Sequence, residues 1–185
     1  MPQQVLNQCE EKMLKAVESM RKDFSTIRTG KANPSILNNV MVDYYGSPMP
    51  INQLASVSAS DPRTILVKPY DKSILKAMEK AILAADLGFN PINDGDVIRI
   101  PVPALTEQTR KELVKQVKKI TEDKKVAVRN IRRDVNEQLK KIEKNKEISE
   151  DDLKYYTDEV QKSTDKWIEK IDVICKDKEK QIMEI

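Results

Sequence analysis

The residues best suited to chemistry in this sequence are three arginines, Arg129, Arg132 and Arg133, which lie within five positions of one another. A planar guanidinium group can bind phosphate oxygens through two parallel hydrogen bonds. The neighbouring acid is Asp134, and one carboxylate cannot neutralise three cations. The cluster therefore predicts a surface that binds phosphate groups of a nucleic acid.

The arginines belong to a longer basic stretch, which the formal net charge of only +3 conceals. Residues 106–145 contain 13 Lys or Arg against 7 Asp or Glu, whereas residues 149–185 contain 7 against 11. Projection at about 100° per residue places seven cations, Arg132 among them, on the outward side of one helix, away from its apolar stripe. They are Lys111, Lys115, Lys118, Lys125, Arg129, Arg132 and Arg133.

Such a row of cations favours docking to RNA, because neutralised phosphates release their counterions. An ordinary solvated face, with lysines that serve solubility, explains the same charge pattern. The pattern alone leaves both interpretations open.

The catalytic templates that depend on histidine are excluded, because the sequence contains no histidine. Neither a P-loop nor a GxGxxG motif occurs, and adjacent carboxylates such as Glu122-Asp123 point in different directions on a helix. Cys9 and Cys175 lie on apolar helix faces, where a thiol behaves as a small buried hydrophobe. We expect no enzymatic activity, no cofactor and no metal.

The flanks of the chain are predicted to be helical, because eight of nine prolines and all four glycines lie between Gly30 and Pro103. Apolar residues recur at steps of three and four from Leu6 to Ile27, from Leu113 to Ile142 and from Leu153 to Ile182. Ser149 and Asp152 form a variant of the capping box at the start of the last helix. Three amphipathic helices predict an up-down-up bundle.

The middle of the chain is predicted to be a small inserted α+β domain. Strands are expected over residues 40–45, 64–67 and 97–102, with one helix over residues 74–85 and a turn at Asp94-Gly95. The predicted domains are residues 1–30 with 105–185, and residues 31–104. Two chain crossings then link them, and we expect a hinge at Thr29, Gly30, Lys31, Pro103, Ala104 and Leu105.

Several longer strings resemble the ribosome recycling factor family across nearly the whole chain. They are FSTIRTGKANPSIL at 24–37, VDYYGSPMPINQLA at 42–55, ADLGFNPINDGDVIRIPVPALTEQTRKEL at 85–113, KVAVRNIRRD at 125–134 and ISEDD at 148–152. The resemblance implies an α+β, mainly α, L-shaped molecule: a long antiparallel three-helix bundle with an inserted small β/α/β domain.

The resemblance also implies a function. Members of the family bind the post-termination 70S-type ribosome through large-subunit rRNA, and elongation factor G with GTP then helps to separate the subunits. We accordingly expect a monomeric, cytoplasmic protein without a membrane segment. A bacterial protein and one from an organelle of bacterial descent are not distinguished.

Six residues are predicted to contact rRNA. Arg110 in LTEQTRKEL, and Arg129 and Arg132 in VRNIRRD, match family positions that contact large-subunit rRNA. Arg133 and Lys125 are added from the outward row of cations. Arg28 in the IRTG motif is a candidate either for RNA contact or for support of the domain junction.

A competing interpretation is a helical-bundle protein-interaction module without RNA binding, in which the charges serve solubility. This alternative predicts little salt-dependent affinity for RNA. A stand-alone enzyme agrees least with the sequence, because no coherent catalytic group of residues occurs.

Overall fold

The computed structural model describes residues 2–184. The chain separates into two compact units, Met1–Phe24 with Val114–Lys180, and Ser25–Leu113 with Gln181–Ile185. Within residues 2–184, no helix is both long and apolar enough to cross a membrane. The exact domain limits predicted from the sequence stay a prediction.

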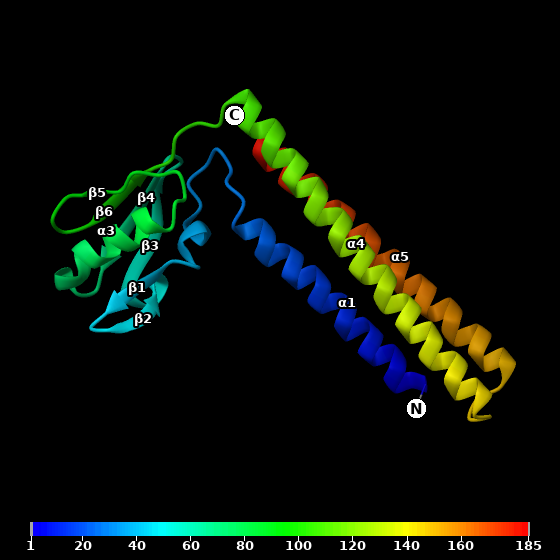
Figure 1. Cartoon of the computed structure of the whole chain (residues 1–185). Helices are drawn as coiled ribbons and strands as arrows, with labels where there is room; N and C mark the ends of the chain where they lie inside the picture. Colours follow the sequence, from blue (N-terminus) through cyan, green and yellow to red (C-terminus); the bar gives the residue numbers. More distant parts are fainter. Residues whose placement is uncertain (1, 185) are drawn as a thin grey trace. The chain divides into compact units, whose positions relative to one another are not determined.

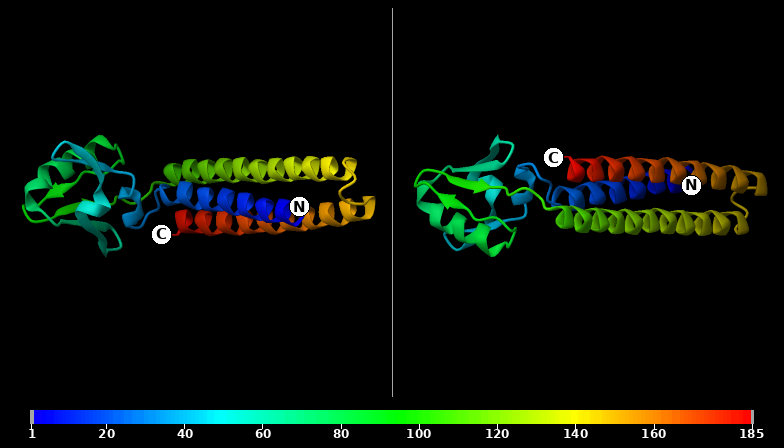
Figure 2. Two further views of the ribbon diagram at one scale, coloured as in Figure 1. Left: turned by 90° about the horizontal axis from the view of Figure 1, so that it is seen from below. Right: turned by 90° about the horizontal axis from the view of Figure 1, so that it is seen from above.

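The first unit consists of long segments of three helices, which confirms the predicted three-helix bundle. The helices are α1 (Pro2–Ser25), α4 (Glu107–Lys144) and α5 (Glu150–Met183). The helices lie side by side in all three views, with α4 antiparallel to α5 (Figures 1 and 2). The predicted mainly α fold class is therefore confirmed.

The apolar stripes of the three helices meet in the interior of the bundle. The buried side chains include Met13, Val17 and Met20 from α1, Val117, Val128 and Leu139 from α4, and Val160, Trp167 and Ile171 from α5. Full burial of one such aliphatic side chain stabilises the fold by about 1.5–3 kcal/mol. No helix can obtain this energy alone, because its stripe needs two neighbours.

A reciprocal capping box sets the start of α5, as the sequence predicted. The Ser149 amide donates to Asp152 Oδ2 at 3.0 Å, and the Asp152 amide donates to Ser149 Oγ at 3.1 Å. Hydrogen bonds from Ser149 lower the pKa of Asp152. The first-turn carboxylate also interacts favourably with the helix dipole.

A polar cluster around Glu10 joins α1 to α5. Trp167 Nε1 donates to Glu10 Oε2 at 2.9 Å, Ser163 Oγ donates to Glu10 Oε1, and Lys166 Nζ lies 3.7 Å from Oε2. Although partial burial favours the neutral acid, these hydrogen bonds and the lysine lower the pKa of Glu10. The cluster fixes the register of α1 against α5.

The second unit contains two antiparallel sheets. Strands β1 (Met41–Tyr44) and β2 (Ser47–Pro50) form a hairpin, and the larger sheet has the order β3-β4-β6-β5. Its strands are β3 (Ala55–Asp61), β4 (Thr64–Pro69), β6 (Ile98–Pro101) and β5 (Ile92–Asn93). The short helices are η1 (Pro34–Leu37), α2 (Ile51–Leu54), η2 (Lys72–Ile74) and α3 (Leu75–Ala84).

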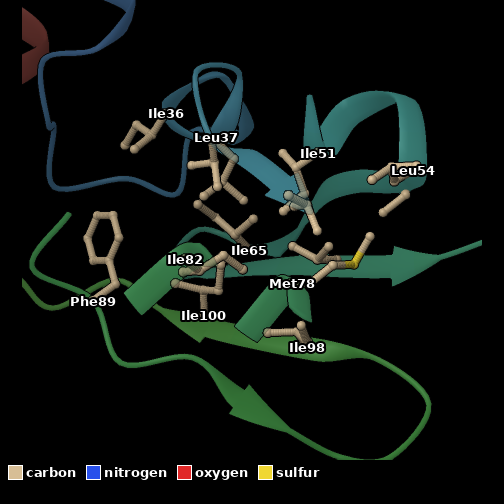
Figure 3. Packing of buried hydrophobic residues seen from close by; sticks show 14 of the residues in the cluster. Ile36, Leu37, Ile51, Leu54, Ile65, Met78, Ile82, Phe89, Ile98 and Ile100 are labelled. Carbon is tan, nitrogen blue, oxygen red and sulfur yellow. The ribbon is translucent and has the colours of Figure 1, made fainter. Parts of the chain in front are cut away.

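The core of this unit lies between the larger sheet and α3. Figure 3 shows Ile65 of β4 and Ile98 and Ile100 of β6 pointing toward Met78 and Ile82 of α3. All five side chains are buried. Since α3 contacts the sheet on one side, the alternate residues of the strands project from the other side.

The structure confirms the predicted strands β1, β4 and β6 and the predicted helix, α3. Asp71 caps the preceding turn by accepting a hydrogen bond from the Ser73 amide at 2.9 Å. Helix α3 ends at Ala84, one residue before the predicted end, and Asp86 beyond it has a left-handed φ of 48°. The predicted turn at Asp94-Gly95 is present, closed by the bond from the Asp94 amide to the Val97 carbonyl at 3.0 Å.

Replacing Glu10 with glutamine should make the bundle less sensitive to acid. The folded-state pKa is lowered from 4.5, so the stabilising contribution is present above that value and is lost as pH falls through the folded pKa. Urea unfolding of wild type and Glu10→Gln at about pH 7 and about pH 3, followed by the fluorescence of the single tryptophan, Trp167, measures this. Glu18→Gln, an exposed carboxylate on α1, is the control. An equal loss of stability on acidification in wild type and Glu10→Gln would contradict the prediction.

Candidate nucleic-acid interface

The predicted row of cations follows one flank of α4, and two of its members, Lys125 and Arg132, reach across to α5. Lys125 Nζ lies 2.6 Å from Asp172 Oδ1 of α5 and 3.5 Å from Glu122 Oε1. About two helical turns further on, Arg132 Nη1 donates to Gln161 Oε1 of α5 at 3.0 Å. The two contacts place this flank beside the groove between the helices.

The outward direction predicted for Lys125 and Arg132 is therefore wrong. The Lys125 side chain is only 15% exposed, and Arg132 is half-buried. A projection from one apolar stripe underestimates the buried sector of a helix that packs against two neighbours, because positions beside the stripe also contact them. Long cationic side chains at such positions cover apolar surface with their stems and bring the charge to the edge.

The charge of Lys125 is already compensated within the bundle. The hydrogen bond that it donates to Asp172 is the main cause that raises the pKa of its ammonium, against the effect of partial burial. Lys124, at the preceding position, points to α1 instead, with Nζ 2.9 Å from Asp23 Oδ2 and 2.8 Å from Ser19 Oγ. These two lysines connect α4 to both of its neighbours.

The remaining cations of the row are available to a partner. Lys111, Lys115, Lys118 and Arg133 are exposed, and Arg129 is half-buried between Lys125 and Arg132. Lys111 pairs with Glu107 at 2.8 Å, an exposed contact that contributes little. Positions 111 to 133 extend over about 33 Å of helix, a length suited to several successive phosphates.

The structure does not bring Arg110 together with the three clustered arginines. It lies 19 residues before Arg129, about 28 Å along the helix, and it belongs to the second unit. Arg110 is half-buried, and its Nε has no hydrogen-bond partner among the described residues. A half-buried guanidinium whose Nε lacks a partner remains a candidate for binding a partner group.

Arg28 connects three segments of the second unit. Its guanidinium carbon lies 5.1 Å from the centre of the Phe89 ring, and its Nη2 donates to the Pro103 carbonyl at 3.1 Å. Gly88 allows this approach with a φ of +76°, which side chains larger than hydrogen rarely adopt. These contacts favour the junction role of Arg28 over the RNA role.

The predicted hinge residues lie together in the second unit. Thr29 is buried and its hydroxyl donates to the Lys31 carbonyl at 3.4 Å, while Arg28 ties this segment to Pro103. A hollow of about 190 Å³ is lined by Gly30, Lys31, Pro62, Arg63, Ala104, Leu105, Arg110 and Glu184. Whether these segments bend stays a prediction.

The described residues contain no group of three or more His, Cys, Asp or Glu side chains that could hold a metal ion. Cys9 and Cys175 are buried free thiols. Burial is the main cause that raises the pKa of Cys9 to about 11, so its reactive thiolate form is scarce at neutral pH.

The sequence is similar to ribosome recycling factors along its whole length. The family described as "Ribosome recycling factor" matches residues 20–183. The chain is 60% identical to the ribosome-recycling factor of Geobacillus sp. (strain WCH70) over 185 residues, which is 100% of both chains. It is 56% identical to that of Bacillus cereus (strain AH187), again over 100% of both.

Solved structures agree with the sequence comparison. A solution structure of the ribosome recycling factor matches with a TM-score of 0.81 and 38% identity, covering 100% of this chain and 98% of that one. Another match is the T. thermophilus ribosome recycling factor with E. coli elongation factor G, bound to the E. coli post-termination complex. Its TM-score is 0.70 at 42% identity, with 100% of both chains covered.

Replacing Arg28 with alanine should destabilise the second unit by about 1–3 kcal/mol, because a cation–π contact and a charged hydrogen bond are lost together. Arg63→Ala, an exposed arginine of the same unit, is the matched control and should change stability by less than about 0.5 kcal/mol. Hydrogen exchange of the β4 and β6 amides measures both variants. Equal protection in Arg28→Ala and wild type would show that these contacts do not stabilise the unit.

Proposed function

Since the chain belongs to the ribosome recycling factor family, we propose that it recycles ribosomes after translation termination. The observation that carries the proposal is 60% identity over the full length of a ribosome-recycling factor. A relative with 42% identity is placed with elongation factor G on a post-termination complex. The proposed partners of this chain are therefore the post-termination ribosome and elongation factor G, in the cytoplasm.

The proposed role is mechanical and not enzymatic. Elongation factor G supplies the GTP hydrolysis, and this chain transmits the resulting force to the ribosomal subunits. The sequence contains no histidine, and its two thiols are buried, so it lacks the commonest general base and an accessible thiol nucleophile. The outcome is dissociation of the subunits and their release for a new round of translation.

The α5-facing flank of α4 is the proposed rRNA contact. Arg129 and Arg133 bind phosphates most directly, since neither forms an ion pair within 4 Å among residues 2–184. Arg132 can exchange its neutral partner Gln161 for a phosphate, which is a stronger acceptor. Lys125 would have to leave Asp172, so its contribution to RNA affinity is smaller.

Arg110 is a second proposed contact, separate from the flank of α4. Its Nε is buried without a partner, and a phosphate oxygen within reach would satisfy the guanidinium. Arg28 acts through the junction segments that it ties together. The proposed hinge comprises residues 29–31 and 103–105, where few residues need to change φ and ψ for a bend.

A double variant, Arg129→Gln with Arg133→Gln, should bind the large subunit at least about tenfold more weakly at low salt. The slope of log affinity against log salt should fall by about one for each lost phosphate contact. Equilibrium binding to purified large subunits over a salt series measures both quantities, and the thermal unfolding of the variant checks that the bundle stays intact.

The matched control is Lys162→Gln with Lys176→Gln, two exposed lysines of α5. This variant removes the same formal charge and should keep most of the wild-type affinity. Equal losses in the two double variants would mean that total charge, and not the flank of α4, determines binding. Binding that is insensitive to salt in wild type would support a protein-interaction module instead.

A further inference from the structure

Strand β3 is an open edge of the larger sheet in the second unit. The strand order is β3-β4-β6-β5, so β3 pairs on one side only, with β4. It spans seven residues, Ala55–Asp61, whereas β5 at the other edge has two. Its length makes β3 the edge that offers a longer row of backbone groups to another chain.

The register shows which backbone groups are free. Pro69 has no N–H, so its pair with Ala55 cannot be a hydrogen-bonded pair, and Tyr70 N donates to the Leu54 carbonyl instead. Hydrogen-bonded and non-bonded pairs alternate in an antiparallel ladder. Ser56 and Ser58 therefore direct their backbone groups toward β4. Val57 and Ala59 direct theirs away from β4.

Apart from a bulge near its end, the edge lacks the features that usually prevent pairing with another chain. Exposed edges are commonly protected by lysine, proline or an inward-pointing charge. The sequence ASVSASD has none of these, and its only charge is Asp61 at the end. Ser58, Ala59 and Ser60 are all exposed, so no segment among the described residues covers this part. The bulge between Ala59 and Asp61 limits the regular edge to the residues before it.

A lysine on the neighbouring strand gives the edge a charge preference. Lys68 of β4 is opposite Ser56 of β3, and it is exposed. Lys72 pairs with Asp96, and Lys72 and, to a smaller extent, Lys68 lower the pKa of that carboxyl; Lys68 itself forms no ion pair within 4 Å with the described residues. Strands are spaced by about 4.8 Å, so an added strand would lie about 10 Å from β4. The Lys68 side chain can cross the small Ser56 to meet a carboxylate there.

We propose that the free edge of β3 binds an extended, acidic peptide segment of a partner protein by strand addition, with Val57 and Ala59 supplying backbone hydrogen bonds and Lys68 meeting a carboxylate. Such recognition takes affinity from the main chain and specificity from alternate side chains. The small Ser56 and Ser58 side chains leave room for larger residues on the added strand.

A second copy of β3 fits this edge less well. Its only carboxylate, Asp61, lies beyond the bulge and accepts a hydrogen bond from the Arg63 amide at 2.8 Å. A symmetric pair of edges would bring together mostly serine and alanine side chains, with Val57 as the single larger apolar residue of each strand, and would bury little apolar surface. A different chain can pair with Lys68 through a carboxylate side chain and can accept hydrogen bonds from the free amides of β3 through its backbone carbonyls.

A synthetic peptide tests the proposal on the whole protein. The probe is an acetylated and amidated octapeptide of alternating threonine and valine with two glutamates, and the control peptide carries lysine at both glutamate positions. Backbone amide shifts of Val57 and Ala59, and their protection from hydrogen exchange, report binding in wild type without any substitution. We expect saturable shifts confined to β3 and β4, and binding of the lysine peptide at least about threefold weaker at low salt.

Two substitutions test separately the backbone hydrogen bonds of Ala59 and the charge of Lys68. Ala59→Pro removes an N–H that faces away from the ladder, a position where proline is tolerated, and should raise the Kd about tenfold. Ala59→Val keeps the N–H and is its control, and Lys68→Ser should remove the preference for glutamate. Lys80→Ser, an exposed lysine on α3, should change nothing.

Three results would each overturn the proposal. One is the absence of a saturable shift at peptide concentrations up to about 1 mM, since weaker binding is not specific recognition. Another is an affinity that Ala59→Pro leaves unchanged while the amide shifts persist. The last is a concentration-dependent increase in mass without peptide that Ala59→Pro abolishes, because the edge would then pair with a second copy.

Discussion

Burial of the apolar stripe of α1 is the interaction on which the rest of the structure depends. Helix α1 ends at Ser25, and the helices that bury Met13, Val17 and Met20 begin at Glu107 and Glu150. The chain must therefore leave the bundle after its first helix and return to it after the inserted segment. Glu10 then fixes the register against α5, and Lys124 fixes it against α4. The flank of α4 that carries the arginines exists only once this packing is complete.

The helices were predictable from the sequence because one face of each is apolar at a period close to 3.6 residues. The strands were less predictable. Strand β2 contains two prolines, β3 consists mostly of serine and alanine, and β5 has only two residues, so none shows the alternation of larger apolar residues that marks a strand. Their pairing is determined by neighbours such as β4, whose Ile65 and Val67 are buried, and this context is tertiary.

The identity of the cationic residues on α4 could be predicted, but not all of their directions. A one-stripe projection cannot separate a free cation such as Arg133 from Lys125, which pairs with α5, because the partner helix is absent from the calculation. The same limit applies to Arg28, whose contacts with Phe89 and Pro103 join residues far apart in sequence. In the structure, some cations, such as Lys125 and Arg28, form contacts within the protein, whereas others, such as Arg133, are exposed and can contact a partner. An arginine with a neutral partner, such as Arg132, can do both.

Splitting of post-termination ribosomes tests the central claim most directly, namely that the chain recycles ribosomes through the α5-facing flank of α4. Light scattering follows the loss of intact ribosomes on addition of the protein, elongation factor G and GTP. We expect rapid splitting with wild type and with Lys162→Gln/Lys176→Gln, and a rate at least about tenfold lower with a folded Arg129→Gln/Arg133→Gln variant at subsaturating protein. Equal splitting by all three proteins would contradict the role of this flank, and no splitting by wild type with a matched elongation factor would contradict the proposed function itself.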